Sequence, residues 1–407
     1  MQRESKSIAL IATGLFGTAF VLPALSLSLL PYSSLFLERK GSGTRAFLLY
    51  AMFIAFLLAM LNAGKLVEAD EGNYFFMFDQ MLKGGNLGLF EAINNATGRL
   101  EILFYAVSYL VFGVLGLSFK AVTIFWTFFA YFVSACSFLI VFKGRIHRIY
   151  ALAVFTFCVI FFINFALTAQ VMRQYAAGSL VLLAFACFDK KARSLILIFL
   201  AALIHNSALI FVIPWCFAVY FHLRANKVPS LMGSLLIMGI LTGFAYFLGD
   251  FLFAYLGNVS GSVEQLYNSS LKDDGDLTLF KIASIALAII VLFYEVKAQD
   301  RGELNPNALP MLFAVLFLGV LLIVVRQLPL LLLRFSFYSD FFSFIALSML
   351  LFRLARHVPV FVILAFPLLA NCVLIARALY SPWTYSWLVD NVGDNFIFTL
   401  LLRVIDA

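Results

Sequence analysis

Charged residues are scarce in this chain: they make up 12% of its 407 residues, whereas hydrophobic residues make up 64%. A water-soluble protein of this size does not need so much apolar sequence, so the composition excludes a soluble globular fold. Strands of alternating apolar and polar residues are also missing, which excludes a transmembrane β-barrel. Apolar runs of about 18 residues or longer recur along the sequence instead. We therefore predict an all-α, polytopic helical bundle in a membrane.

Cysteine is scarce as well, and its spacing matches no metal or disulfide pattern. The five cysteines all fall in apolar segments at unrelated spacings, at positions 136, 158, 187, 216 and 372. We interpret them as small core or lipid-facing residues. The acidic stretch at 273–276 lacks the ligand spacing of an EF-hand calcium loop. We therefore expect no metal and no other cofactor.

The net charge of +7 arises from short basic loops and not from a basic stripe, so we expect no nucleic-acid partner. The positive-inside rule places these loops in the cytoplasm, at 39–45, 143–148, 190–193, 224–227 and 353–356. Three longer loops carry more acid than base and are predicted to be extracytoplasmic, near 63–100, 257–278 and 377–394.

The apolar runs predict a single membrane domain, 1–407, with about 12–14 transmembrane helices. The candidate helices are 8–30, 46–62, 101–118, 121–142, 150–168, 175–188, 194–204 joined to 206–221, 230–250, 279–296, 307–325, 336–352, 358–376 and 395–404. The pair near 194–221 is predicted to be broken or re-entrant.

The predicted topology contains one conflict, between the outer loop 63–100 and the inner loop 143–148. An odd number of crossings must separate these loops, yet two apolar runs lie between them, 101–118 and 121–142. Either 101–118 is re-entrant or 63–100 is cytoplasmic despite its acidic balance. We favour the re-entrant segment.

The most informative segment runs from Met172 to Pro214, where two apolar helices meet at a basic turn and carry Arg173 and His205. Ionisable side chains are costly in hydrocarbon and usually line a functional polar cavity. At about 1.5 Å per residue, Arg173 lies roughly 24 Å from Asp189, and His205 lies about 18 Å from the basic turn. We therefore expect both side chains to face one recessed cavity in the outer leaflet, beside a helix break.

This segment resembles the signature of the EpsG/Wzy-type polysaccharide polymerases. It has an Arg-Gln pair at 173–174, a Lys-rich turn at 189–193 and an Ala…His…Ser-Ala run at 201–208. Other similar elements are an acidic and tyrosine segment at 68–74, the run Glu101–Tyr105, the element Arg334–Tyr338 and an aromatic loop at 380–383. The run Glu101–Tyr105 departs from the family, because Ile102 and Leu103 stand where the family has Pro-Gly.

The resemblance implies a membrane glycosyltransferase of the bacterial inner membrane. Such an enzyme polymerises undecaprenyl-pyrophosphate-linked oligosaccharide repeat units at the periplasmic face, producing the O-antigen of lipopolysaccharide or an exopolysaccharide. The growing glycan moves from its carrier to the terminal sugar of another lipid-linked unit, and the first carrier leaves as pyrophosphate. The resemblance also implies membrane lipids and a chain-length regulator protein as partners.

The departing pyrophosphate needs positive charge, which we assign to Arg173, with Arg334 and Arg326 as partners. Arginine stays protonated when buried and offers paired donors to phosphate. Arg326 has a second interpretation, as an anchor that reaches the membrane surface. The remaining residues expected to bind substrate are Gln174, Asn206 and Tyr338.

His205 is the first candidate for the general base that takes the proton of the attacking hydroxyl. It could also bind pyrophosphate as a donor, or cap the helix break through the two residues that follow it. If His205 is not the base, a carboxylate must be, because sugar chemistry commonly uses acidic groups. The candidate carboxylates are Asp70, Glu71 and Glu101.

Two other functions fit the same class of protein. An O-antigen ligase would transfer the glycan to lipid A core, and it would be expected to carry a larger extracytoplasmic loop. A lipid-linked oligosaccharide flippase would transport without chemistry and would be expected to show internal repeats. The loops here are modest and no repeat of the central motif is found, so we favour the polymerase.

Overall fold

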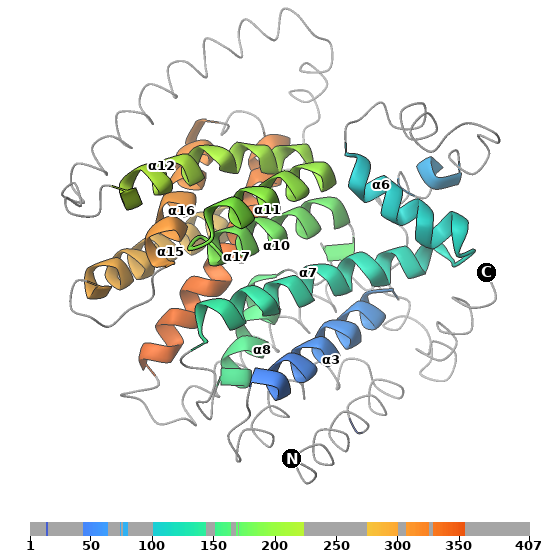
Figure 1. The fold of residues 1–407 in the computed structure, drawn as a ribbon, viewed down its shortest axis with the longest axis horizontal. Coiled ribbons are helices and arrows are strands. Elements are labelled where there is room, and N and C mark those ends of the chain that lie inside the picture. Colours follow the sequence, from blue (N-terminus) through green and yellow to red (C-terminus); the bar gives the residue numbers. More distant parts are fainter. Residues whose placement is uncertain are drawn as a thin grey trace, which may run out of the picture.

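The computed structural model consists of helices joined by short turns over the residues that it describes (Figure 1). These residues are 14, 44–63, 74, 76–79, 101–143, 151–163, 168–169, 171–223, 275–299, 307–324 and 329–354. No strand occurs among them, which confirms the all-α prediction for this part of the chain.

The regular elements follow one another along the chain as α-helices interrupted by two short irregular turns. The α-helices are α3 (Thr44–Ala63), α6 (Ile102–Tyr109), α7 (Phe119–Val141), α8 (Ala151–Phe162), α10 (Met172–Ala186), α11 (Lys191–Ile204), α12 (Val212–Leu223), α15 (Gly275–Gln299), α16 (Ala308–Val324) and α17 (Pro329–Leu354). A π-helical turn, η1 (Leu110–Val114), extends α6, and a 3₁₀ segment, η2 (Asn206–Phe211), precedes α12.

Each predicted helix in the described ranges has a counterpart, but several begin earlier than predicted. Helix α10 begins at Met172, so Arg173 lies in its first turn and not before it. Helix α17 begins at Pro329, a residue suited to a first turn because it has no N–H that needs a partner. Helix α15 begins at Gly275, so the end of the predicted loop 257–278 is helical.

Several predictions fall outside the described residues. These are the helices 8–30, 230–250, 358–376 and 395–404, the loop 377–394 and most of the loop 63–100.

The central helices form two successive hairpins. The turn after α10 reverses the chain, so that the Ser194 hydroxyl of α11 donates to the Ala184 carbonyl at 2.7 Å. The chain reverses again at His205, and the Trp215 indole of α12 donates to the Ser194 hydroxyl at 3.0 Å. His205 has an extended backbone (φ −150°, ψ 116°), which ends α11 and starts the 3₁₀ segment. The break predicted near 194–221 is therefore present, as the tip of a helical hairpin.

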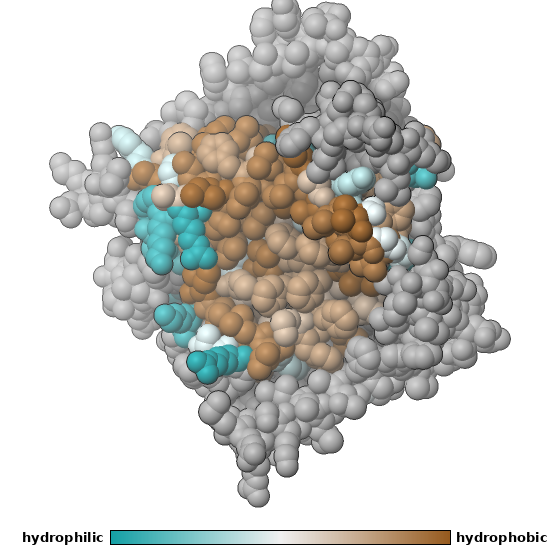
Figure 2. Space-filling model, turned by 45° about the vertical axis from the view of Figure 1, so that its right-hand side comes forward, coloured by the Kyte–Doolittle hydropathy of each residue, from teal (hydrophilic) through white to brown (hydrophobic). Residues whose placement is uncertain are grey.

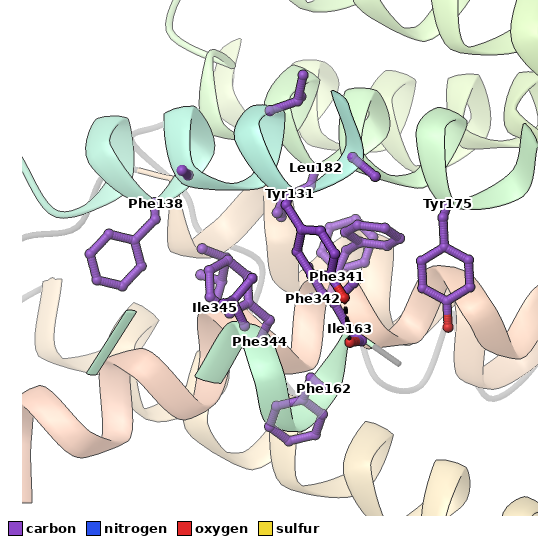
Figure 3. Packing of buried hydrophobic residues seen from close by; sticks show 14 of the residues in the cluster. Tyr131, Phe138, Phe162, Ile163, Tyr175, Leu182, Phe341, Phe342, Phe344 and Ile345 are labelled. Atoms are coloured by element: carbon purple, nitrogen blue, oxygen red, sulfur yellow. Dashed lines mark hydrogen bonds between the residues drawn. The ribbon is translucent and has the colours of Figure 1, made fainter. Parts of the chain in front are cut away.

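Aromatic side chains fill the core between these helices (Figure 3). Phe47 of α3, Phe138 of α7 and Phe155 of α8 pack with ring centroids 5.3–5.5 Å apart. Helices α10 and α17 touch at Gly178, where an added Cβ would lie 2.4 Å from the Phe341 ring. Glycine is therefore required for this close approach, which brings the first turn of α10 beside the first half of α17.

Apolar side chains also cover a broad area of the surface (Figure 2). Among the described helices, two are long and apolar enough to cross a membrane, Phe119–Val141 and Arg334–Leu354. The segment Ile102–Val114 is apolar but extends only roughly 20 Å, less than the roughly 30 Å of a hydrocarbon core. Its length fits the predicted re-entrant segment, whereas the number of crossings stays a prediction.

Candidate active site

Arg173 lies at the centre of a buried polar cluster. Its guanidinium donates through Nε to the Tyr74 hydroxyl at 3.1 Å and through Nη1 to the Tyr105 hydroxyl at 2.9 Å. Nη1 also forms an ion pair with Oε2 of Glu101. The guanidinium carbon lies 4.9 Å from the centre of the Tyr74 ring, a cation–π distance. The charge is thus neutralised and held in place, although only 7% of Arg173 is exposed.

Glu101 connects the three segments that meet here. It occupies the residue before α6 and is 4% exposed. While Oε2 pairs with Arg173 on α10, Oε1 accepts the backbone N–H of Asn206 at 3.3 Å and lies 3.9 Å from Nε2 of His205. The first turns of α6, α10 and η2 therefore converge on one carboxylate. Glu101 therefore ties the starts of these three segments together through side-chain and backbone contacts.

The tautomer of His205 follows from its contact with Ser207. The Ser207 backbone N–H donates to Nδ1 at 3.3 Å, and a backbone amide can only donate. Nδ1 of the neutral imidazole is therefore the acceptor, and Nε2 carries the proton. The Ser207 hydroxyl lies 2.6 Å from Nδ1, so it donates to Nδ1 as well. The N–H at Nε2 of His205 is therefore on the edge of the ring nearer to Oε1 of Glu101.

Tyr338 completes a chain of hydroxyl contacts. Its hydroxyl lies 2.8 Å from the Ser207 hydroxyl. Because Ser207 donates to His205, it must accept from Tyr338, which fixes the direction of the chain. Tyr338 is 1% exposed and its ring packs on Phe211, with centroids 5.0 Å apart. Tyr338 therefore acts on the site through Ser207 and holds α17 against the hairpin tip.

Gln174 and Arg334 join α10 to α17 through a side chain and a backbone group. The Gln174 side-chain amide donates to the Arg334 carbonyl at 2.5 Å, and Gln174 is buried. The Arg334 side chain is partly exposed, and its guanidinium forms no ion pair with any residue that the structure describes. Arg334 thus contacts this part of the protein through its backbone carbonyl, whereas Arg173 places its guanidinium inside the cluster.

The geometry can be compared with known proteins. A family model described as the EpsG family matches residues 47–391. The chain belongs to the EpsG family. No curated protein and no solved structure matches it. The resemblance predicted from the central motif is confirmed, and membership of the EpsG family indicates a polysaccharide polymerase-like membrane protein.

The structure brings together most of the predicted site residues of this EpsG-family protein. Arg173, Glu101, His205 and the Asn206 backbone meet directly, and Tyr338 joins them through Ser207. The Asn206 side chain, by contrast, is exposed. Asp70, Glu71 and Arg326 lie outside the described residues.

Three further residues hold the cluster together: sequence reasoning assigned no role to Tyr74 or Tyr105, and it considered Ser207 only as part of a helix cap at His205. Tyr74 and Tyr105 carry hydroxyls that accept from Arg173, and Ser207 carries the contact between His205 and Tyr338. The two tyrosines stood in the family motifs, but nothing in the sequence identified their partner. A second buried network, centred on Asp340, was missed entirely. Its signal was a lone acidic residue and a lone lysine inside two predicted transmembrane helices.

The described residues of the EpsG-family protein contain no group of three or more metal-ligating side chains. The four cysteines within the described ranges are free thiols, Cys136, Cys158, Cys187 and Cys216. The arrangement is instead one of an acid, two cations and a histidine at converging helix ends. Such a set can orient a carboxylate, donate to an anion and move a proton.

Proposed function

We propose that this EpsG-family protein is a membrane glycosyltransferase that polymerises undecaprenyl-pyrophosphate-linked oligosaccharide repeat units at the periplasmic face of the inner membrane. The observation that carries the proposal is the buried Arg173–Glu101 pair beside His205, at the tip of a hairpin inside an apolar bundle. Burying an ion pair seldom adds stability, because desolvation offsets the attraction between the charges. A pair of this kind at a helix break is better explained by chemistry on a charged substrate.

The reaction sets two demands on the protein. The bond between the anomeric carbon and the carrier pyrophosphate breaks, and a bond forms from that carbon to a hydroxyl of the acceptor sugar. The hydroxyl gives up its proton to a base. The pyrophosphate leaves with the bonding electrons and needs donors that stabilise its charge. The site must therefore hold a base and an anion-binding group close to the anomeric carbon.

Glu101 is the group best suited to be the base. The Arg173 guanidinium holds Oε2, while Oε1 is turned toward His205 and the hairpin tip. Carboxylates perform this role against oxocarbenium-like centres in other glycosyl-transfer chemistry. Arg173 is then a residue that orients the base. Its Nη2 has no hydrogen-bond partner among the described residues, so it can also reach an anion.

His205 is better suited to be a donor than a base. Its Nδ1 is occupied by Ser207, and its Nε2 already carries a proton. An Nε2–H at the hairpin tip can donate to a phosphate oxygen of the leaving group. Arg334, partly exposed on α17, supplies the second positive charge for that anion.

A direct test uses purified protein in detergent with one lipid-linked repeat unit, and resolves the products as a glycan ladder. We expect wild-type protein to form a ladder. We expect Glu101→Gln to form it more slowly by a factor of about 10²–10⁴, the usual contribution of a general base. The matched control is Glu295→Gln, because Glu295 is also a buried glutamate paired with an arginine, but it joins α15 to α17. Its variant should keep the ladder. Equal loss in both variants would contradict the role of Glu101.

The same preparation separates the alternative functions. A ligase would attach the glycan to an added lipid A core acceptor and would leave the repeat unit unextended. A flippase would move the lipid-linked unit across a liposome bilayer without forming any new glycosidic bond. Either result, with no ladder from wild-type protein, would replace the polymerase proposal.

A further inference from the structure

We infer that a second buried network, formed by Lys281, Asp340 and Tyr175, is a positioning device for the active site. It sets the rotation of α17 and through it the contact between Tyr338 and Ser207. The inference rests on the proposed function, and it adds three residues that neither the family resemblance nor the active-site geometry assigns.

The network joins three helices through one carboxylate. Oδ2 of Asp340 on α17 accepts the Tyr175 hydroxyl of α10 at 2.9 Å, and Oδ1 pairs with the Lys281 ammonium of α15. The exposed fractions are 1% for Asp340, 4% for Lys281 and 0% for Tyr175. The Phe337 ring packs against both partners, with its centre 5.7 Å from the Tyr175 ring and 5.8 Å from the ammonium. The three side chains therefore form a neutral, sealed junction.

This junction lies next to the site on two helices at once. Tyr175 follows Arg173 by two residues on α10, and Asp340 follows Tyr338 by two residues on α17. Residues two apart on an α-helix point to roughly opposite sides, because each residue turns the helix by about 100°. Each helix thus directs one residue to the active site and the other to the junction. Fixing the junction therefore fixes the rotation at which Arg173 and Tyr338 are presented.

Burial makes this constraint strict. Turning α17 by one residue would move the Asp340 carboxylate away from both partners and leave a lone charge inside the bundle, which is strongly unfavourable. Buried polar contacts of this kind are known to specify the register of packed helices. The Gln174 contact to the Arg334 carbonyl and the tight packing at Gly178 act in the same direction.

A second buried ion pair on the same two helices provides an internal comparison. Glu295 of α15 pairs with Arg353 of α17, and nearer the junction the Ser343 hydroxyl donates to the Ser284 carbonyl at 3.3 Å. The residue numbers of the contacting pairs rise together along both helices, so α15 and α17 run parallel. The Glu295 pair lies about 21 Å along the helix from Lys281, far from the site. It joins the same two helices at a distance from the junction.

A double-mutant cycle between Tyr175→Phe and Tyr338→Phe tests the inference. Each change removes one hydroxyl and keeps the ring. If the junction acts through Tyr338, each single variant loses about tenfold in kcat with little change in KM, and the double variant is no slower than the slower single variant. The positioning role would be overturned if the two single-variant losses in kcat multiplied in the double variant, or if Tyr175→Phe kept the wild-type kcat.

Charge variants separate positioning from general stability. We expect Asp340→Asn, which keeps a hydrogen-bonding side chain of the same size, to retain more kcat than Asp340→Ala at equal folded fraction. Glu295→Gln is the control and should lower thermal stability without lowering kcat per folded molecule. If activity follows the folded fraction in all three variants, the junction has only a structural role and the inference is refuted. Because wild-type ladder formation and the Glu101→Gln result are measured alongside, failure of the proposed function would be seen separately.

Discussion

The role of His205 can be decided by replacing it with glutamine and with alanine. Glutamine can place a side-chain N–H close to the position of Nε2, but its amide is not a base at neutral pH. If His205 donates to the leaving pyrophosphate, His205→Gln keeps the interaction and His205→Ala removes it. Removal of one preorganised donor costs about 10²–10³ in kcat. We therefore expect the kcat of His205→Ala to fall by that factor and the kcat of His205→Gln to stay within about tenfold of wild type.

The assay is single-turnover formation of the first glycan extension across a range of pH, with lipid-linked substrate above its KM. The alternative role predicts a different pattern, since a general base contributes about 10²–10⁴ and glutamine cannot replace it. Equal losses in the glutamine and alanine variants would therefore refute the donor assignment. The structure adds a second requirement. Ser207→Ala removes the hydroxyl contacts to Nδ1 and to Tyr338 but keeps the backbone N–H, so the tautomer should survive while kcat falls by about tenfold, as in Tyr338→Phe.

Three further predictions concern the buried pair, the helix contact and the metal. Arg173→Met should destabilise the protein by about 3–5 kcal/mol, because it leaves Glu101 charged and buried, and Arg173→Met with Glu101→Leu should recover much of that loss in thermal unfolding. If the double variant is as unstable as the single, the ion pair is not the cause. Gly178→Ala should cost about 1–3 kcal/mol, because its Cβ would lie 2.4 Å from the buried Phe341 ring; unchanged unfolding would show that the ring can move aside. A chelator should leave ladder formation unchanged, and recovery by an added divalent cation after loss would contradict the expected absence of a metal.

Much of the helical framework could be predicted because hydrophobic periodicity and length are local properties of the sequence. The break at His205 was also predictable, since a histidine followed by Asn206 and Ser207 interrupts an apolar run. Helix starts were less accurate. Helix α10 begins before its apolar run does, because Arg173 and Gln174 find buried partners on other segments. Tertiary contacts of this kind override the local preference of polar residues for a loop.

The site was only partly predictable for a related reason. Arg173 and His205 stood out because isolated ionisable residues are rare in apolar segments. Glu101 did not stand out from the other acidic candidates, since its identity as the partner of Arg173 depends on a contact across 72 positions of sequence. The contact of Lys281 with Asp340 spans 59 positions and was missed for the same reason. Single-sequence reasoning finds which residues are unusual, but it does not find which residues meet.

The three buried ion pairs of the described residues differ in a way that bears on function. Lys281–Asp340 and Glu295–Arg353 both join α15 to α17. Only Arg173–Glu101 lies where the first turns of three helical segments converge, beside a partly exposed histidine. Helix N-termini favour negative charge, so this pair lies where the pyrophosphate of the proposed reaction would be stabilised. The same convergence explains why the hairpin must break at His205. In a continuous helix the Asn206 N–H would donate to a backbone carbonyl of the same helix. Glu101 would then lose the donor that orients it.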